Sequence, residues 1–119
     1  MNVVILQGSL TSEPSSRTLG SGSQLVQLEV TTRGEDGTCS VPVAWFDPPQ
    51  PVSLAAGTEV VVAGVVRRRF FRSGGTTQSR TEVVATQVLP ARRRAAVRRL
   101  VAQHVERLGA VEGGTVRSG

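Results

Sequence analysis

The stretch TEVVVAGVVRRRFFRSGGTTQSRTEVVATQVL, residues 58–89, decides the predicted fold. Its first part, residues 60–66, is apolar on both faces of an extended chain, which is typical of a strand that is covered on both sides. The turn residues Gly74 and Gly75 follow, and a second valine-rich segment continues to Leu89. We therefore predict a long β-hairpin with a basic, aromatic tip.

The tip of this hairpin combines cations with flat rings. Alternation along a strand places three of its residues on each face: Arg67, Arg69 and Phe71 on one, and Arg68, Phe70 and Arg72 on the other. Arginines bind phosphates and aromatic rings stack on bases of any identity, so this pattern favours single-stranded nucleic acid, with Arg80 on the returning strand as a further contact. The alternative is an exposed hairpin whose rings pack locally and whose arginines maintain solubility.

Composition and charge are those of one small domain with a polyanionic partner. The chain has 119 residues, 14 basic residues that are all arginine, nine acids and a formal charge of +5. Cys39 is the only cysteine, so an intramolecular disulfide and a cysteine zinc cluster are excluded, and we expect a cytoplasmic, nucleoid-associated protein. No segment approaches the roughly 20 apolar residues of a membrane span, so we expect no membrane partner.

Three further strands precede the hairpin, at residues 2–10, 24–32 and 39–46. The first is apolar on both faces as far as Leu6, which indicates a contact between subunits. Residues 11–22 are predicted to be polar turns and residues 33–37 a turn, while Pro42 places its position at a sheet edge or bulge. Five strands without βαβ alternation predict an all-β fold, a five-stranded OB-type barrel whose fourth and fifth strands form the hairpin arm.

The segments that flank the hairpin differ in character. Residues 47–57 contain three prolines, which forbid a helix over most of the segment, and we expect it to be too short to cover the end of the barrel. Residues 91–108 predict an amphipathic helix with Gly109 as its C-terminal cap and with a stripe of apolar residues: Val97, Leu100, Val101, Val105 and Leu108. His104 lies in that stripe and is interpreted as a packed histidine. The domain organisation is a nucleic-acid-binding domain at 1–90, the helix at 91–108 and a disordered glycine-rich tail at 109–119.

The helix is basic as well as amphipathic. Arg92, Arg93 and Arg94 crowd its predicted first turn, where the helix macrodipole disfavours cations, so a polyanion would explain them as a second nucleic-acid-binding cluster. Arg98 and Arg99 fit a solvated face better. We predict that this helix is ordered and docked, either closing the end of its own barrel or packing between protomers.

Three stretches resemble bacterial single-stranded DNA-binding proteins: VVILQGSLTSEP at the start, GTEVVVAGVVRRRFF in the fourth strand and RTEVVATQV in the fifth. The resemblance covers residues 1–89. It implies an OB-fold that assembles as a homodimer or homotetramer and wraps single-stranded DNA on aromatic platforms and basic grooves.

The resemblance also implies roles for single residues. Trp45 falls on the family's aromatic position at the end of the third strand, and Phe71 falls on the one in the hairpin. The family has two other aromatic positions that lack an aromatic residue here. One is occupied by Cys39 or Ser40, and the other falls in the loop at Arg33, which we predict to be a basic contact. Trp45 has an alternative role as a core residue. The acidic C-terminal tip with which family members recruit repair enzymes is not present in the tail GAVEGGTVRSG.

These observations leave two functions open. The first is non-sequence-specific binding of single-stranded DNA in replication, repair and recombination, with RNA as an alternative ligand. The second is a divergent OB-fold paralogue that acts mainly as a primosome-like assembly module with weak affinity for nucleic acid. Catalytic motifs, a metal site and a cofactor site are not indicated, because the sequence contains no Ser-His-Asp set, P-loop, GxGxxG or clustered metal ligands.

Overall fold

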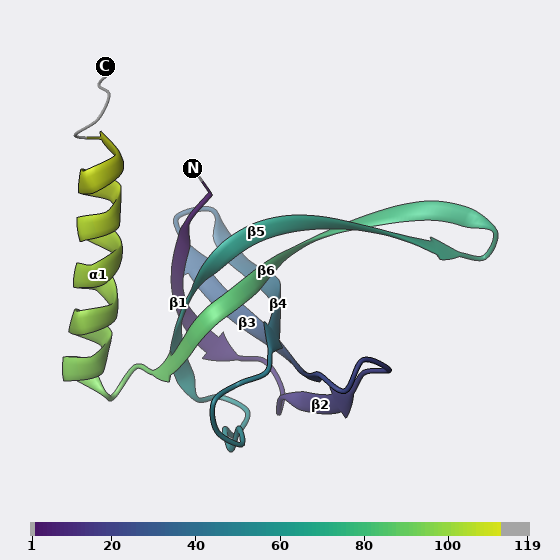
Figure 1. Ribbon diagram of the computed structural model, residues 1–119, viewed down its shortest axis with the longest axis horizontal. Helices are drawn as coiled ribbons and strands as arrows, with labels where there is room; N and C mark the ends of the chain where they lie inside the picture. Colours follow the sequence, from purple (N-terminus) through teal and green to yellow (C-terminus); the bar gives the residue numbers. More distant parts are fainter. Residues whose placement is uncertain (1, 113–119) are drawn as a thin grey trace.

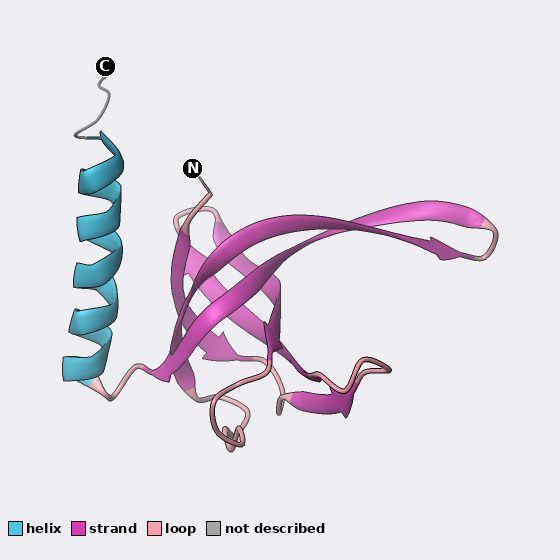
Figure 2. Ribbon diagram, in the orientation of Figure 1, coloured by secondary structure: helices cyan, strands magenta, loops and turns pink. Residues whose placement is uncertain are grey.

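Six strands and one helix make up the structure, a computed structural model that describes residues 2–112 (Figure 1). In chain order they are β1 (Val4–Leu10), β2 (Ser15–Thr18), β3 (Gln24–Gly34), β4 (Gly37–Phe46), β5 (Glu59–Ser73), β6 (Thr76–Pro90) and α1 (Arg94–Glu112). Figure 2 shows that the strands form one body and that the helix stands beside it. The predicted class, mainly β with one C-terminal helix, is confirmed.

Five of the strands close into a ring. β1 pairs with β5, β5 with β6, β6 with β4 and β4 with β3, and the end of β1 closes the ring by pairing with Val30 and Thr31 of β3. All of these pairs are antiparallel except β4 with β6, which is parallel over residues 43–45 of β4. Pro42 lies one residue outside that parallel pairing, at an edge position as predicted. β2 pairs with β3 beside the ring, within a segment for which only turns were predicted.

The core fills the inside of the ring. Its walls are the inward side chains of all five ring strands, and the fully buried ones include Leu10, Val30, Val60 and Val62. Gly8 lies where β1 crosses β3, and a Cβ there would overlap the carbonyl oxygen of Thr31. Glycine therefore permits the close approach that closes the ring.

A β-bulge interrupts the β5–β6 ladder. Ala63 pairs with Gln87 but Gly64 pairs with Ala85, so Thr86 is an extra residue on β6. The Thr86 Oγ1 hydroxyl donates to the carbonyl oxygen of Ala63 at 3.1 Å. A Cβ on Gly64 would overlap the backbone of Val84, so the bulge requires glycine opposite it. Bulges bend and twist a strand pair, and the β5–β6 pair leaves the ring beyond this point.

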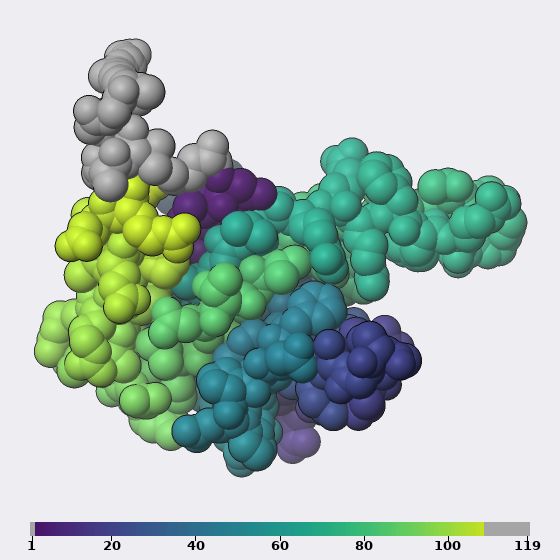
Figure 3. Space-filling view, viewed as in Figure 1, coloured from purple at the N-terminus to yellow at the C-terminus, as the bar shows by residue number. Residues whose placement is uncertain are grey.

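Beyond the ring, β5 and β6 continue as a two-stranded arm that projects from the molecule (Figures 1 and 3). Pairing runs without a break from Arg67 opposite Glu82 to Ser73 opposite Thr76. Gly74 and Gly75 have φ values of 61° and 83°, which two-residue hairpin turns matched to the strand twist require. The long hairpin predicted from the sequence is confirmed, and below we call residues 67–82 the arm.

Helix α1 packs on the outside of the ring. Leu100 is 1 % exposed and packs with Val61 and Ala63 of β5, whose side chains face away from the core. His104, 8 % exposed, is packed as predicted, and its Nδ1 lies 2.8 Å from the carbonyl oxygen of Leu100. Val101 and Val105 of the predicted stripe are 38 % and 60 % exposed, so these two residues are not docked, contrary to the prediction. The helix packs on the outer side of β5 and does not close the end of the ring.

The limits of α1 also differ from the prediction. The helix begins at Arg94, so two of the three clustered arginines precede it, and it continues through Gly109 to Glu112, so the predicted cap at Gly109 is wrong. The rest of the predicted tail, residues 113–119, lies outside the described residues. Within residues 2–112, no helix has both the length and the apolar character needed to cross a membrane.

The proline-rich segment between β4 and β5 covers one end of the ring. It contains no helix, as predicted, and Val52 and Leu54 pack against the core cluster. Its ends are tied to neighbouring strands through Asp47 and Gly57. The segment therefore covers part of this end of the ring, and a cavity stays open between it and β6, so the expectation of a less covered end holds in part.

We expect Gly64→Ala to destabilise the protein by about 1–3 kcal/mol, because the added methyl group forces the two strands apart at the bulge. Gly34→Ala is the matched control: Gly34 is also a strand glycine, but a Cβ there meets nothing within 4 Å. Urea unfolding followed by circular dichroism measures both variants. Equal midpoints for the two would contradict the requirement for glycine at the bulge.

Candidate nucleic-acid interface

The two faces of the arm differ in their surroundings. Strand alternation is unbroken along β5, so Arg67, Arg69 and Phe71 continue the outer surface of the ring, on the side away from the core. Their partners on β6 are Glu82, Arg80 and Gln78.

Arg67 is held in place at the base of the arm. Its Nη2 lies 2.5 Å from Oε2 of Glu82, whose side chain is only 5 % exposed. The guanidinium carbon lies 5.8 Å from the centroid of the Phe46 ring, within the range of a cation–π interaction. Arg67 therefore compensates a buried carboxylate and joins the arm to β4, while 43 % of its side chain stays exposed.

The next pair along this face carries positive charge without compensation. Arg69 lies directly opposite Arg80, an arrangement that is repulsive in a sheet. Within the part of the chain that the structure describes, the buried Nε of Arg69 has no hydrogen-bond partner. Glu82 is the one acid on this face of the arm, and Arg67 already binds it. An anion from outside the chain could bind at this pair through the exposed guanidinium group of Arg80.

An aromatic ring adjoins this pair. The guanidinium carbon of Arg69 lies 6.0 Å from the centroid of the Phe71 ring, which is 38 % exposed. Planar guanidinium groups and rings beside each other can accept a phosphate and an unstacked base respectively.

The same surface continues across the ring beyond Phe46. On the outer side, Phe46 lies opposite Leu25 of β3, and Leu25 lies opposite Arg17 of β2. Leu25 is 4 % exposed and is thus buried although it faces away from the core. We call the whole row the outer strip; its members are Arg17, Leu25, Phe46, Arg67, Arg69, Phe71 and Arg80.

The opposite face of the arm is open to solvent. Phe70 is 64 % exposed, and Arg68 and Arg72 are exposed beside it. Arg72 donates from Nη2 to the carbonyl oxygen of Gly75 at 3.2 Å and so is tied to the turn. The two faces follow the alternation predicted from the sequence, but only the outer face joins the surface of the ring.

Three groups of predicted site residues lie away from the outer strip. Trp45 points to the inside of the ring and packs against the core cluster. Arg33 lines a hollow with Gln7, Thr31, Glu59 and their neighbours, far along β3 from Leu25. The predicted secondary cluster, Arg92, Arg93 and Arg94, lies at the corner between β6 and α1.

Three members of the outer strip, Arg17, Leu25 and Phe46, were not predicted as site residues. Phe46 adjoins Trp45, and alternation along β4 places the two rings on opposite sides of the sheet, so only one of them could belong to an outer surface. Arg17 lies in the segment for which only turns were predicted. Its position is fixed by pairing with β3, and no local sequence signal indicates that pairing.

No protein-family model matches this chain, and no curated protein sequence matches it. Among residues 2–112, no group of three or more histidine, cysteine, aspartate or glutamate side chains is placed to hold a metal ion.

We expect Arg67→Ala to lower the free energy of unfolding by about 1–3 kcal/mol, because it leaves the buried carboxylate of Glu82 without its partner. Arg68→Ala, one residue away on the exposed face, removes the same charge without this effect. Denaturant unfolding at neutral pH compares the two. Equal losses would show that the ion pair does not hold the base of the arm.

Proposed function

We propose that this protein binds single-stranded DNA, without sequence specificity, along the outer strip. One observation carries the proposal: the half-buried Arg69 and its neighbour Arg80 lie opposite each other without an acid to compensate them, beside the exposed ring of Phe71. A phosphate satisfies the cations, and the ring offers a stacking surface to the adjacent base.

A single strand suits the strip better than a duplex does. Phe71 presents its exposed ring on the outer surface, and stacking on it needs a base that is not already stacked in a helix. No helix enters a groove in this arrangement, since α1 lies on the other side of the ring from the arm (Figure 1). Stacking and phosphate contacts serve every base, so binding is expected to be insensitive to sequence.

The order of the strands supports an OB-fold as part of this proposal. The ring closes in the order β1, β3, β4, β6, β5, with one parallel contact between β4 and β6. OB-folds bind oligonucleotides on the face of their second and third strands and on the loops that follow the first and fourth. Here the corresponding parts are β3 with β4, the segment that contains β2, and the arm, which together carry the whole outer strip.

Self-association, as a homodimer or homotetramer, belongs to the same proposal. β1 pairs with β3 only at Ser9 and Leu10, so residues 4–8 have a strand partner on one edge only within the described chain. Ile5 on this strand is 39 % exposed. An open, apolar strand edge favours pairing with another chain. We place the protein in the cytoplasm, in DNA replication, repair or recombination.

We expect the affinity for a long oligothymidylate to fall steeply with salt. Neutralising about three to five phosphates predicts a slope of roughly −2 to −3.5 for log K against log salt concentration. Arg69→Ala should reduce the magnitude of this slope by about 0.7, because one phosphate contact is lost. Arg107→Ala, an exposed arginine on α1, is the matched control and should leave the slope unchanged.

Fluorescence anisotropy of a labelled oligonucleotide measures both slopes. A flat salt dependence in the wild-type protein would remove the electrostatic basis of the proposal. Stronger binding of duplex than of single strand in competition would contradict the role of the exposed rings. Failure to bind either at low salt would favour the assembly-module function.

We expect Phe71→Ala to weaken binding of the oligothymidylate by about 1–3 kcal/mol, because one base loses its stacking partner. Phe70→Ala is the control within the same arm. The phenyl group of Phe70 is more exposed than that of Phe71, but it lies on the face of the arm that does not continue the outer surface of the strand ring. Anisotropy titrations at one salt concentration compare the two. If both variants fold and bind as tightly as the wild-type protein, the two phenylalanines only pack locally and do not stack on bases.

A further inference from the structure

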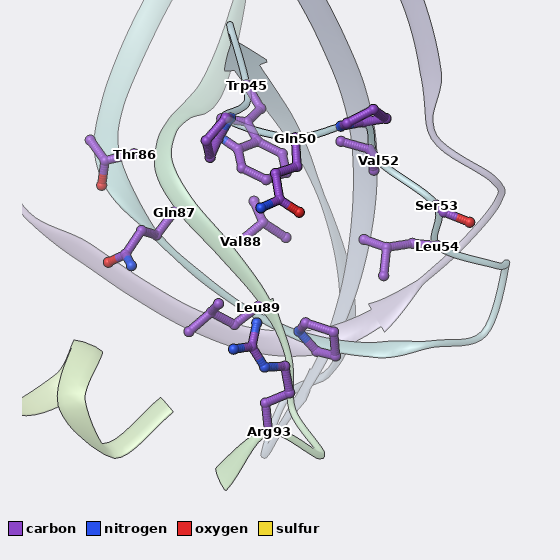
Figure 4. A pocket seen from close by; sticks show the side chains of 13 residues that line it. Trp45, Gln50, Val52, Ser53, Leu54, Thr86, Gln87, Val88, Leu89 and Arg93 are labelled. Atoms are coloured by element: carbon purple, nitrogen blue, oxygen red, sulfur yellow. The ribbon is translucent and has the colours of Figure 1, made fainter. Parts of the chain in front are cut away.

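A cavity of about 330 Å³ opens at the end of the strand ring, between the proline-rich segment and β6 (Figure 4). Trp45 forms one wall, and Val52, Leu54 and Val88 line the apolar interior. Its volume is at the lower end of the range for small-ligand pockets, roughly 300–1,000 Å³. It therefore suits one nucleoside-sized group and not a run of stacked residues.

The wall opposite β6 is tied at both ends. At its start, Asp47 accepts from the backbone nitrogen of Gln24 at 2.9 Å through Oδ1, and its own backbone nitrogen donates to the carbonyl oxygen of Gln24 at 2.8 Å. At its end, the backbone nitrogen of Gly57 donates to the carbonyl oxygen of Leu10 at 2.8 Å. Hydrogen bonds thus fix the two ends of the proline-rich segment to β3 and β1.

Prolines stiffen the segment between these ties. Pro49 and Pro51 both line the cavity, and their rings fix φ on either side of Gln50. Figure 4 shows the side chain of Gln50 extending into the cavity beside Trp45 and Val88. Little conformational freedom of the backbone remains to be lost when a ligand enters, which favours binding.

A cation lies at the other side of the cavity. Arg93 lines it, and the corner between β6 and α1 fixes the Arg93 backbone: its nitrogen donates to the carbonyl oxygen of Pro90 at 3.0 Å, and its carbonyl oxygen accepts from Val97 at 3.0 Å. In Figure 4 the guanidinium group extends alongside Leu89 toward the cavity. This geometry separates Arg93 from Arg92, which lines a different hollow with Glu59.

We propose that this cavity receives one unstacked base of a bound single strand. The chemistry of its walls matches a nucleotide in three respects: the indole of Trp45 offers a stacking face, the amide of Gln50 can hydrogen-bond to a base edge, and Arg93 can bind the adjoining phosphate. An apolar peptide side chain would need neither the amide nor the cation. The proposal rests on the proposed function and adds a second site to it.

The position of the cavity on β4 connects it with the outer strip. Trp45 and Phe46 are neighbours on the last two residues of the strand, with Trp45 on the inner side and Phe46 on the outer side. A strand that follows the outer strip across Phe46 reaches the end of β4, and its next base can turn around that end into the cavity. The cavity thus forms one end of the binding path.

The intrinsic fluorescence of the full chain tests this directly, because Trp45 is the only tryptophan. Oligothymidylate is titrated at low salt while anisotropy of a labelled oligonucleotide measures binding independently. We expect Trp45 emission to be quenched in parallel with binding and to become shielded from acrylamide. Phe71→Ala should lower the affinity but leave the quenching at saturation unchanged.

Two pairs of variants test the cavity residues. Gln50→Ala and Arg93→Ala should each weaken binding about 2- to 10-fold, the effect of one lost hydrogen bond or phosphate contact. Their matched controls are Gln103→Ala and Arg98→Ala, two exposed positions of α1 outside the cavity, and each should change the affinity less than twofold. Sedimentation of each variant records the mass of the assembly.

Each outcome decides the proposal. Binding by the wild-type protein with unchanged Trp45 emission, and equal affinities for Arg93→Ala and Arg98→Ala, would overturn the base site and leave the outer strip standing. Absence of wild-type binding at low salt would overturn both the base site in the cavity and the proposed binding along the outer strip. A change of mass in Gln50→Ala would assign the cavity to a contact between copies of the chain and would also overturn the base site.

Discussion

The β-bulge at Thr86 is the constraint on which the rest of the structure depends. Without this extra residue, Val88 and Ala85 could not both face the core, because three positions separate them and a strand alternates every two. The bulge keeps both inside and requires Gly64 opposite. It also adds a local bend and twist to the β5–β6 pair, within the part of the pair that belongs to the ring. One added residue thus preserves the core of the ring.

The parts of the fold predictable from sequence are those set by local chemistry. The valine runs and the turn at Gly74 and Gly75 specify the arm without reference to the rest of the chain. β2 escaped prediction because all four of its residues are exposed, so burial imposes no pattern on them. The end of α1 escaped because glycine at a helix end is only a preference, and Gly109 within a helix costs about 1 kcal/mol, which other interactions can outweigh.

The candidate site, too, has one part that local sequence predicts and one part that depends on strand pairing. Arginines and rings adjacent in the arm are visible in the sequence, and their separation onto two faces follows from alternation alone. Phe46 and Arg17 join them only through the pairing of β4, β3 and β2, which no neighbouring residue encodes. The sequence likewise could not predict whether Trp45 faces the core or the outer surface, because both sets of alternating positions in β4 contain apolar residues. It becomes fixed once Val43 is known to face the core.

The outer strip is also where the sequence departs from what stability alone would favour. If the arm's arginines served only solubility, they would be exposed and well separated, as Arg68 and Arg72 are. Arg69 is instead half-buried, faces Arg80 and leaves its Nε without a partner in the described chain. Conflicts of this kind, retained beside a well-formed ion pair at Arg67, are typical of sites that are completed by a ligand. Solubility therefore accounts for one face of the arm, and the proposed binding of an anion would account for the other.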